Sequence, residues 1–295
     1  MDIIRKEFTI RDHMPLVTGL VKGPTSAALQ RAQKLPFKGI LYRDDGLDDY
    51  GRPIFTKVAE NTVVLGGAIF ALEKITGQEA SFKPNTLNSI LGVNDTGYDY
   101  NLANTQIALF GCGIGGAGLD FGNVYDPNVK QNNVQQLVPM MVAENDLTGT
   151  DADKYMMATT IDTTGGTTLK CWYLKEAEQA PIIRSLWKDA AEEDEDGTEI
   201  TEDISDSESL NDVECFAQFK LKLLQDDVRS YFNAMGMLSM ARYNSVGLYT
   251  GEKVLLSNGT YDYVNVRLFS VVNLNNEPLD ERKEITYYYR IYAMV

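Results

Sequence analysis

The C-terminal third of the chain decides the fold, and it opens on the stretch Glu214-Cys-Phe-Ala-Gln-Phe-Lys-Leu-Lys-Leu-Leu224. Phe219, Leu221 and Leu223 alternate there with polar residues, which is the period of a half-buried β-strand. The chain closes on a second extended stretch, Glu284-Ile-Thr-Tyr-Tyr-Tyr-Arg-Ile-Tyr-Ala-Met-Val295. Because chain ends fray unless something pairs with them, we expect this terminal strand to dock in the same sheet or against another subunit.

One helix is predicted between these two strands. Residues 228–235 place apolar side chains on one helical face, and Gly236 follows as a stop signal. Asp226 or Asp227 is the expected N-cap, since an aspartate side chain accepts hydrogen bonds from the free amides of a first helical turn. The sequence thus predicts a strand, a helix and then a return to β-structure.

Two glycine-containing turn signals mark this return. Gly251-Glu252 separates predicted strands at 248–250 and 253–256. Asn258-Gly259 suits a type I′ turn before a further strand over 261–272. We therefore expect hairpins in this region, completed by the terminal strand.

The N-terminal part of the chain is interrupted by proline and glycine and carries few strand signals. We expect residues 1–58 to form an extended arm with loops, including a short helix at 25–33 and a polar, acidic loop over 41–53. The first apolar side chains follow no sustained period and cannot bury one another locally, so we expect them to contact other chains. The residues assigned to such contacts are Ile3, Ile4, Phe8 and Leu16.

The middle of the chain mixes helices and strands. A helix is predicted over 61–75 and another over 86–91, where apolar residues recur at helical spacing. The pair Gly66-Gly67 disfavours the first helix unless another backbone approaches it closely. Strands are predicted over 106–110, 137–142, 155–158 and 167–174, and one or two helical turns are predicted beyond Pro181.

Together these elements predict an α+β fold, mainly antiparallel β with a few helices, a loop-rich N-terminal arm and an acidic insertion. Four segments are expected along the chain. They are the arm and loops over 1–58, a mixed helix and strand core over 59–188, the acidic insertion over 189–210, and a C-terminal β-rich domain over 211–295 that completes the core.

The composition is that of a globular chain. With 295 residues, 44% of them hydrophobic, it can bury a large core. The net charge of −15 disfavours a duplex-binding protein, which needs a basic face to displace counterions from phosphates. The N-terminus lacks the apolar core of a signal peptide, and no run of about 18 apolar residues exists to cross a bilayer. We therefore expect no membrane association and synthesis and retention in the cytoplasm.

The cysteines and the single histidine give little support to enzyme chemistry. Cys112, Cys171 and Cys215 are widely spaced, and His13 alone accompanies them, so a structural zinc site is not expected. A cysteine nucleophile or a serine triad would need the same histidine, which stands beside Met14-Pro15 in a loop-like start. The sequence therefore predicts a protein without catalysis and without a cofactor.

A glycine-rich stretch leaves two interpretations open. Gly111-Cys-Gly-Ile-Gly-Gly116 follows a predicted strand and matches the dinucleotide pattern G-x-G-x-x-G. A dinucleotide site needs a helix directly after the pattern, whereas residues 117–127 hold two more glycines and a proline. The alternative is a mobile or closely packed glycine loop, for example one that fits against a neighbouring subunit. The glycines concerned are Gly111, Gly113, Gly115, Gly116 and Gly118.

An acidic run over 189–208 also has two interpretations, because 11 of its 20 residues are Asp or Glu. Glu192, Asp194, Asp196 and Asp203 fall at positions 1, 3, 5 and 12 of a calcium-loop pattern. The calcium-loop pattern has aspartate at the first position and glutamate at the twelfth. The departures favour a solvated insertion kept extended by like charges, with calcium binding as the alternative.

Three stretches combine in a way typical of one protein group. They are the arm broken by proline and glycine, the segment Phe110-Gly-Cys-Gly-Ile-Gly-Gly-Ala-Gly118, and Val266-Arg-Leu-Phe-Ser-Val-Val-Asn-Leu-Asn-Asn276 leading to Tyr287-Tyr-Tyr-Arg-Ile-Tyr292. In this combination the chain resembles the virion structural proteins of tailed bacteriophages, of the neck, tail or baseplate type.

The resemblance implies a non-enzymatic subunit in a ring or other symmetric layer at the head–tail neck or in the tail, or a component of the baseplate. Its implied partners are copies of itself and other virion proteins, and its implied location is the virion, assembled in the host cytoplasm. The resemblance also implies an acidic lumen past which DNA slides without sequence-specific binding. The rival class is a soluble protein that binds a nucleotide or calcium.

The terminal strand indicates how a structural subunit would contact its neighbours. Alternation assigns Tyr287 and Tyr289 to one face and Tyr288 and Tyr292 to the other. Tyrosine combines apolar area with a polar tip and is enriched at interfaces. We therefore expect core on one face and a subunit contact through Tyr288 and Tyr292 on the other. The alternative is a central strand that the same chain covers on both faces.

Overall fold

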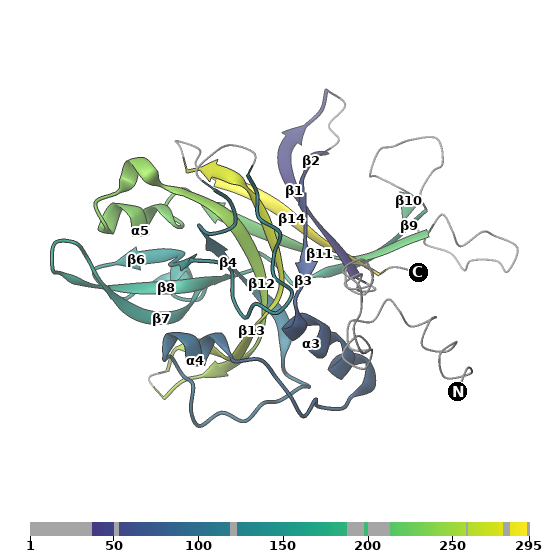
Figure 1. Ribbon diagram of the computed structural model, residues 1–295, viewed down its shortest axis with the longest axis horizontal. Coiled ribbons are helices and arrows are strands. Elements are labelled where there is room, and N and C mark those ends of the chain that lie inside the picture. Colours follow the sequence, from purple (N-terminus) through teal and green to yellow (C-terminus); the bar gives the residue numbers. More distant parts are fainter. Residues whose placement is uncertain are drawn as a thin grey trace, which may run out of the picture.

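Two antiparallel β-sheets packed face to face form the body of the protein (Figure 1). The computed structural model describes residues 37–49, 53–118, 123–187, 198–199, 213–257, 259–279 and 284–293. Within these ranges the fold is mostly antiparallel β with few helices, as the sequence predicts.

The six-stranded sheet joins the two ends of the described chain. Its strands are β1 (Phe37–Leu47), β2 (Pro53–Glu60), β9 (Ile182–Trp187), β10 (Thr198–Glu199), β11 (Val213–Leu224) and β14 (Glu284–Ala293), in the spatial order β10-β9-β11-β14-β1-β2. The last strand thus lies between β1 and β11. Strand pairing therefore links the predicted N-terminal segment directly to the predicted C-terminal domain.

The eight-stranded sheet is built around a long hairpin. Its strands are β3 (Thr62–Val63), β4 (Gln106–Gly113), β5 (Leu137–Val138), β6 (Met141–Ala143), β7 (Tyr155–Asp162), β8 (Thr168–Glu176), β12 (Arg242–Leu255) and β13 (Tyr261–Pro278). The order is β3-β13-β12-β4-β8-β6, with β5 on β4 and β7 on β8. The strands predicted in the middle of the chain are thereby confirmed, although 137–142 divides into two short strands.

Three short α-helices lie beside this second sheet: α3 (Leu65–Thr76), α4 (Leu87–Leu91) and α5 (Arg229–Ala234). Short 3₁₀ turns cover Gly149–Asp151 and Leu238–Met240. The helices predicted over 61–75, 86–91 and 228–235 are confirmed, and α3 ends on Gly77, which lies in the left-handed region. A Cβ at Gly67 would lie 2.0 Å from the Phe269 carbonyl oxygen, so the paired glycines let the helix approach the backbone of β13.

The main core fills the space between the sheets. Apolar side chains of both sheets form one buried cluster, which includes Leu41, Phe110, Phe219, Leu221, Val246, Leu248, Phe269, Val272, Tyr287 and Tyr289. A second cluster covers the other side of the eight-stranded sheet with residues such as Leu87, Leu109, Leu174, Tyr249 and Leu268. The eight-stranded sheet is therefore buried on both sides.

Four local predictions are wrong. The segment 41–53, predicted as a loop, mainly belongs to the β1–β2 hairpin. The helical turns predicted beyond Pro181 are the strand β9, which pairs with β11. Gly251-Glu252 is no turn, because β12 continues through it with a register shift against β13. The N-cap position of α5 is Val228, and no side chain caps that helix.

The hairpin that Asn258-Gly259 predicts is present, because β12 and β13 pair up to Leu255 and Tyr261. Asn258 itself, the helix predicted at 25–33 and most of the acidic run lie outside the described residues.

Candidate functional site

The terminal strand β14 has two faces of different surroundings. Ile285, Tyr287, Tyr289 and Ile291 point into the core between the sheets and are buried, as the alternation predicts. On the opposite face, here called the outer face, β1 contributes Tyr42 and β11 contributes Phe216, among charged and polar neighbours. The candidate site is built on this outer face.

On the core side, tyrosine hydroxyl groups join the two sheets. The hydroxyl oxygens of Tyr243 and Tyr287 lie 2.5 Å apart. The Tyr289 hydroxyl lies 2.8 Å from the hydroxyl of Ser270 and accepts a 2.8 Å hydrogen bond from the Asn61 amide. Burial, the largest cause, raises the pKa of Tyr287 and of Tyr289 well above that of free tyrosine. These hydroxyl groups therefore remain neutral and act as structural cross-links.

On the outer face, the guanidinium group of Arg290 lies among three aromatic rings. Its carbon lies 4.8 Å from the ring centres of Tyr42 and Phe216, and 5.3 Å from that of Phe55. Its Nε atom donates a 2.9 Å hydrogen bond to the side-chain oxygen of Gln218. Arg290 is only 1% exposed. A cation held over several aromatic rings away from water forms a strong contact and fixes the positions of those rings.

Tyr288 and Tyr292 flank this arginine on β14 and are half-buried. The Tyr292 ring lies 5.0 Å from the Phe216 ring, and its hydroxyl lies 3.3 Å from the Tyr42 hydroxyl. The Tyr288 ring meets the Phe55 ring edge-on at 5.0 Å. The predicted partner-binding tyrosines are therefore brought together, within an aromatic surface that spans four strands.

A charged rim surrounds the aromatic centre. Lys38 and Lys57 both lie 2.9 Å from Glu60, and Lys222 lies 2.9 Å from Glu284. Hydrogen bonds from Lys57 and Lys38 lower the pKa of Glu60 below its ordinary value. An aromatic centre with a polar rim is the composition of a protein-binding surface. This composition suits binding.

The glycine stretch lies elsewhere, on the eight-stranded sheet. Gly111 and Gly113 are the last part of β4 and pair with β12. The amide of Gly115 donates to the Gln135 carbonyl at 3.0 Å, that of Gly116 to the Asn244 side chain at 2.7 Å, and that of Gly118 to the Asn123 carbonyl at 2.8 Å. These amide groups already have acceptors within the chain. A phosphate bound here would have to displace them.

Close packing explains why small residues occupy this stretch. A Cβ at Gly116 would lie 2.2 Å from the Asn244 carbonyl oxygen, and one at Gly113 would lie 2.4 Å from that of Gln135. The Asn244 side chain also donates to the Ile114 carbonyl at 3.1 Å. The geometry is that of a closely packed loop, the second of the two sequence interpretations, with neighbours from the same chain.

Sequence reasoning missed a buried charged pair beneath β11. The Lys175 ammonium lies 2.5 Å from a carboxylate oxygen of Asp227, and it also donates to the Lys222 carbonyl at 2.9 Å. The Tyr155 hydroxyl donates to the other Asp227 oxygen at 2.5 Å, and the Leu224 amide donates to the first at 2.8 Å. Burial raises the pKa of Asp227, while the Lys175 ammonium opposes that change. The sequence singles out Asp227 of this pair, as one of the two candidate N-caps, and gives no signal for Lys175.

This pair fixes the turn that follows β11. Val228, directly after Asp227, has φ 61°, a strained value for a β-branched residue. Its amide donates to the Met140 carbonyl at 2.8 Å. Cys112 lies near the pair, and burial raises the pKa of its thiol well above the ordinary value. Asp227 and Val228 are both fully buried, so this cluster is structural in character.

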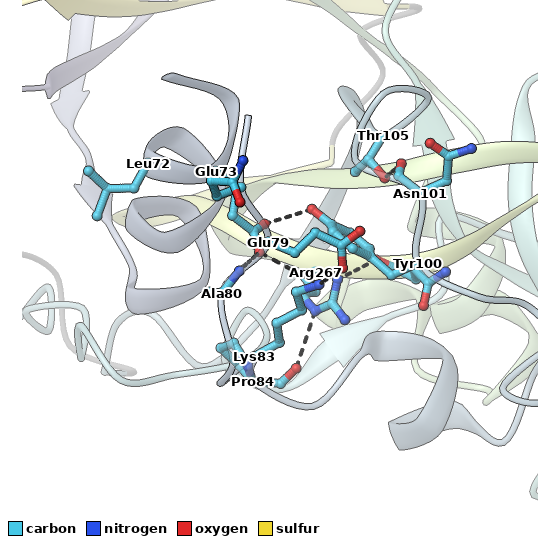
Figure 2. Close-up of polar contacts among 12 residues, drawn as sticks. Leu72, Glu73, Glu79, Ala80, Lys83, Pro84, Tyr100, Asn101, Thr105 and Arg267 are labelled. Carbon is cyan, nitrogen blue, oxygen red and sulfur yellow. Dashed lines mark hydrogen bonds and ion pairs between the residues drawn. The ribbon is translucent and has the colours of Figure 1, made fainter. Parts of the chain in front are cut away.

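Figure 2 shows a second polar cluster, which holds the long connection between α3 and β4. The carboxylate of Glu73, 3% exposed, accepts hydrogen bonds from the Tyr100 hydroxyl at 2.7 Å and the Ala80 amide at 2.8 Å. The Lys83 ammonium lies 3.5 Å from the centre of the Tyr100 ring, and the Arg267 guanidinium carbon lies 4.9 Å from it. Two cations stacked on one ring therefore tie the connection to β13.

The remaining predicted site residues lie outside the described ranges. These are the arm residues Ile3, Ile4, Phe8 and Leu16 and the calcium alternative Glu192, Asp194, Asp196 and Asp203. In the part of the chain that the structure describes, no group of three or more His, Cys, Asp or Glu side chains is arranged to hold a metal ion. Among the same residues, no helix has both the length and the apolarity needed to cross a membrane.

Neither a protein-family model, nor a curated protein, nor a solved structure matches this chain. The function is therefore argued from the geometry of the outer face.

Proposed function

We propose that the chain is a non-enzymatic structural subunit of a tailed-phage particle, assembled as a ring or symmetric layer at the head–tail neck or in the tail. A baseplate position is the alternative. One observation carries this proposal: the outer face of the six-stranded sheet is an aromatic surface with a charged rim, centred on Arg290. Its composition suits the binding of protein and offers no chemistry for a substrate.

Exposed apolar residues at opposite sides of the same sheet support assembly. In the β1–β2 hairpin, Leu47 is 67% exposed and Ile54 is 41% exposed. On β9, near the other edge, Ile182 is 46% exposed and Ile183 is 80% exposed. A head-to-tail contact that joins two different surfaces closes into a ring when its rotation permits. Two unlike apolar surfaces at opposite edges suit such a contact.

The arm and the acidic segment complete the proposal. Ile3, Ile4, Phe8 and Leu16 of the loop-rich N-terminal arm contact neighbouring subunits, together with Tyr288 and Tyr292. The acidic insertion and the net charge of −15 supply an acidic lumen past which DNA slides. The partners are copies of this chain and other virion proteins, and the location is the virion, after assembly in the host cytoplasm.

The oligomeric state of purified protein tests this function. Light scattering and electron microscopy are expected to reveal a closed symmetric oligomer. Tyr288→Ala and Tyr292→Ala are expected to weaken association at least tenfold, since buried aromatic anchors dominate interfaces, with little change in the melting temperature. Removing residues 288–295 is expected to cost much of the stability, because β14 is a central strand. Tyr98→Ala, an exposed tyrosine elsewhere, is the matched control.

Two results would contradict the proposal. One is a protein that stays monomeric at all accessible concentrations. The other is a pair of tyrosine variants that lower the melting temperature as strongly as the truncation while leaving association unchanged.

A further inference from the structure

The side chains at the centre of the outer face are buried, although no layer of described helices or strands lies over them. Tyr42 and Phe216 are each 2% exposed, and Arg290 is 1% exposed. Leu186 on β9 and Ile40 on β1 lie on the same face and are also buried. The four apolar residues among them belong to neither of the two apolar clusters that line the eight-stranded sheet. They therefore form a group of their own on the outer face, apart from the core.

No described helix or strand packs extensively over this face. The strands of the six-stranded sheet contact one another and, through β3 and β13, the eight-stranded sheet. The three α-helices pack on strands of the eight-stranded sheet (Figure 1). An occupant of the outer face must therefore come from outside the described elements.

We propose that residues 1–36 of this chain dock on the outer face, within one copy in the free subunit and on the neighbouring copy in the assembly. The exchange between copies rests on the function proposed above. Exchange of an identical segment between protomers is an economical route to an oligomer, since the contact already exists within one copy.

The place where the segment joins the sheet supports this assignment. Residue 36 is followed by Phe37, the first residue of β1, which pairs with Ala293. Ala293 pairs in turn with Cys215, and Cys215 with Ser185, so these four residues form one row across the sheet. A segment of 36 residues reaches roughly 120 Å when extended, whereas the 12-residue strand β11 is roughly 40 Å long. It is long enough to cross its own outer face or that of a neighbour.

The composition of the segment matches the surface. Residues 1–36 contain 12 Ile, Leu, Val, Met or Phe residues, the hydrophobic material that an aromatic surface requires. The acidic run over 189–208 is the other long stretch outside the core, and its only such residues are Ile200 and Ile204 beside 11 carboxylates. An aromatic centre is therefore matched by the arm and not by the acidic run.

Lysine cross-linking of the full chain tests the contact. Lys220, Tyr288, Tyr42 and Lys57 form one row across the outer face, so two lysines flank the aromatic centre. An equal mixture of unlabelled and ¹⁵N-labelled protein is treated with an amine cross-linker, dilute and assembled, and the linked peptides are identified by mass spectrometry. Lys6 and Lys22 are expected to link to Lys57 and Lys220. Lys170, on β8 of the other sheet, is the control acceptor.

The expected result is same-isotope links in dilute protein and mixed-isotope links in the assembly. The full-length variant Ile3→Ser/Ile4→Ser/Phe8→Ser is expected to lose at least fivefold in the yield of links from Lys6. Ile75→Ser, a change at a 72% exposed residue of α3, is expected to leave that yield unchanged.

The other possible outcomes distinguish a failure of the arm docking from a failure of the proposed structural function. If Lys6 and Lys22 link to Lys170 as readily as to Lys220, the docking is wrong whatever the oligomeric state. If the oligomer forms but its links stay within one isotope, the exchange is wrong and the structural function stands. If the protein is always monomeric while the arm still links to Lys220, the structural function and the exchange fail, and the docking within one copy holds.

Discussion

The two faces of the six-stranded sheet carry similar residue types and meet different surroundings. The core face places Tyr287 and Tyr289 against the eight-stranded sheet, where their hydroxyl groups have partners in other strands. The outer face places Tyr288 and Tyr292 around a buried arginine, with rings of its own sheet as the partners found among the described residues. Tyrosine on the two faces of one strand thus has two settings, hydroxyl cross-links to other strands inside and aromatic rings around a cation outside, where we propose that partners bind.

This difference indicates where an interface can be recognised. A core face is closed by an element of the same fold, so its polar groups are satisfied in pairs across the two sheets. On the proposed binding face, the Arg290 guanidinium holds aromatic rings in place, and such preorganisation favours the binding of a partner. The comparison leads to three predictions that test it with stability measurements.

The largest effect is expected beneath the core face, at Asp227→Ala. This change leaves the Lys175 ammonium, 4% exposed at its side chain, without its carboxylate. Removing one member of a buried ion pair costs about 3–5 kcal/mol of unfolding free energy. The measurement is urea unfolding at neutral pH. The double variant Lys175→Met/Asp227→Leu is expected to recover much of the loss, because it removes both charges together. A single variant no less stable than the wild type would show that water reaches this pair.

A smaller effect is expected at the centre of the outer face, at Arg290→Met. The variant keeps much of the side-chain volume and loses the cation over three rings and the bond to Gln218. A desolvated contact of this kind is worth about 2 kcal/mol, whereas an exposed one is worth about 0.5–1 kcal/mol. Lys222→Met, at the rim, is the matched control. If Arg290→Met loses as little unfolding free energy as Lys222→Met, the centre of the outer face is solvent-exposed. The contrast between centre and rim would then be wrong.

The sequence predicted the elements whose periodicity is uniform along their length. The alternation around Phe219 and along β14 identified both central strands, and helical spacing identified α3 despite Gly66 and Gly67. In these elements one face is buried along the whole length, so the apolar residues recur with an unbroken period.

Elements whose surroundings change along their length were predicted wrongly. Asp44 and Asp45 suggested a loop, yet β1 tolerates them because this end of the hairpin is exposed. Gly251 suggested a turn, but a register shift accommodates it within β12, where it pairs with Gln106. Asp227 matched a helix cap because capping depends on local residues alone, while its ion partner Lys175 is distant in sequence.

For the candidate site, alternation along the terminal strand was enough to place Tyr288 and Tyr292 on one face. The other rings that surround Arg290 come from β1, β2 and β11, and their convergence depends on strand order. Period-2 patterns fix which face a residue takes but carry no information on which strands become neighbours. The arginine itself therefore could not be recognised as the centre.

The smallest effect is expected at the rim, at Glu60→Gln. Hydrogen bonds from Lys57 and Lys38 lower the pKa of Glu60 in the folded protein, so the unfolded chain binds its proton more readily. The stabilisation is therefore fully present above the usual glutamate pKa of about 4.3 and is lost as the pH falls through the lower folded value. Since the Glu60 side chain is 54% exposed, solvent screening keeps the loss below about 1 kcal/mol.

Thermal unfolding of the wild type and Glu60→Gln at pH 6 and pH 3 measures this difference, with Glu144→Gln, an exposed glutamate after β6, as the control. The wild type is expected to be the more stable at pH 6, with a smaller margin in high salt, since exposed ion pairs are screened. At pH 3 the margin is expected to shrink. A margin that persisted undiminished at pH 3 and in high salt would place Glu60 in a water-excluded contact, and the rim would then belong to the buried centre.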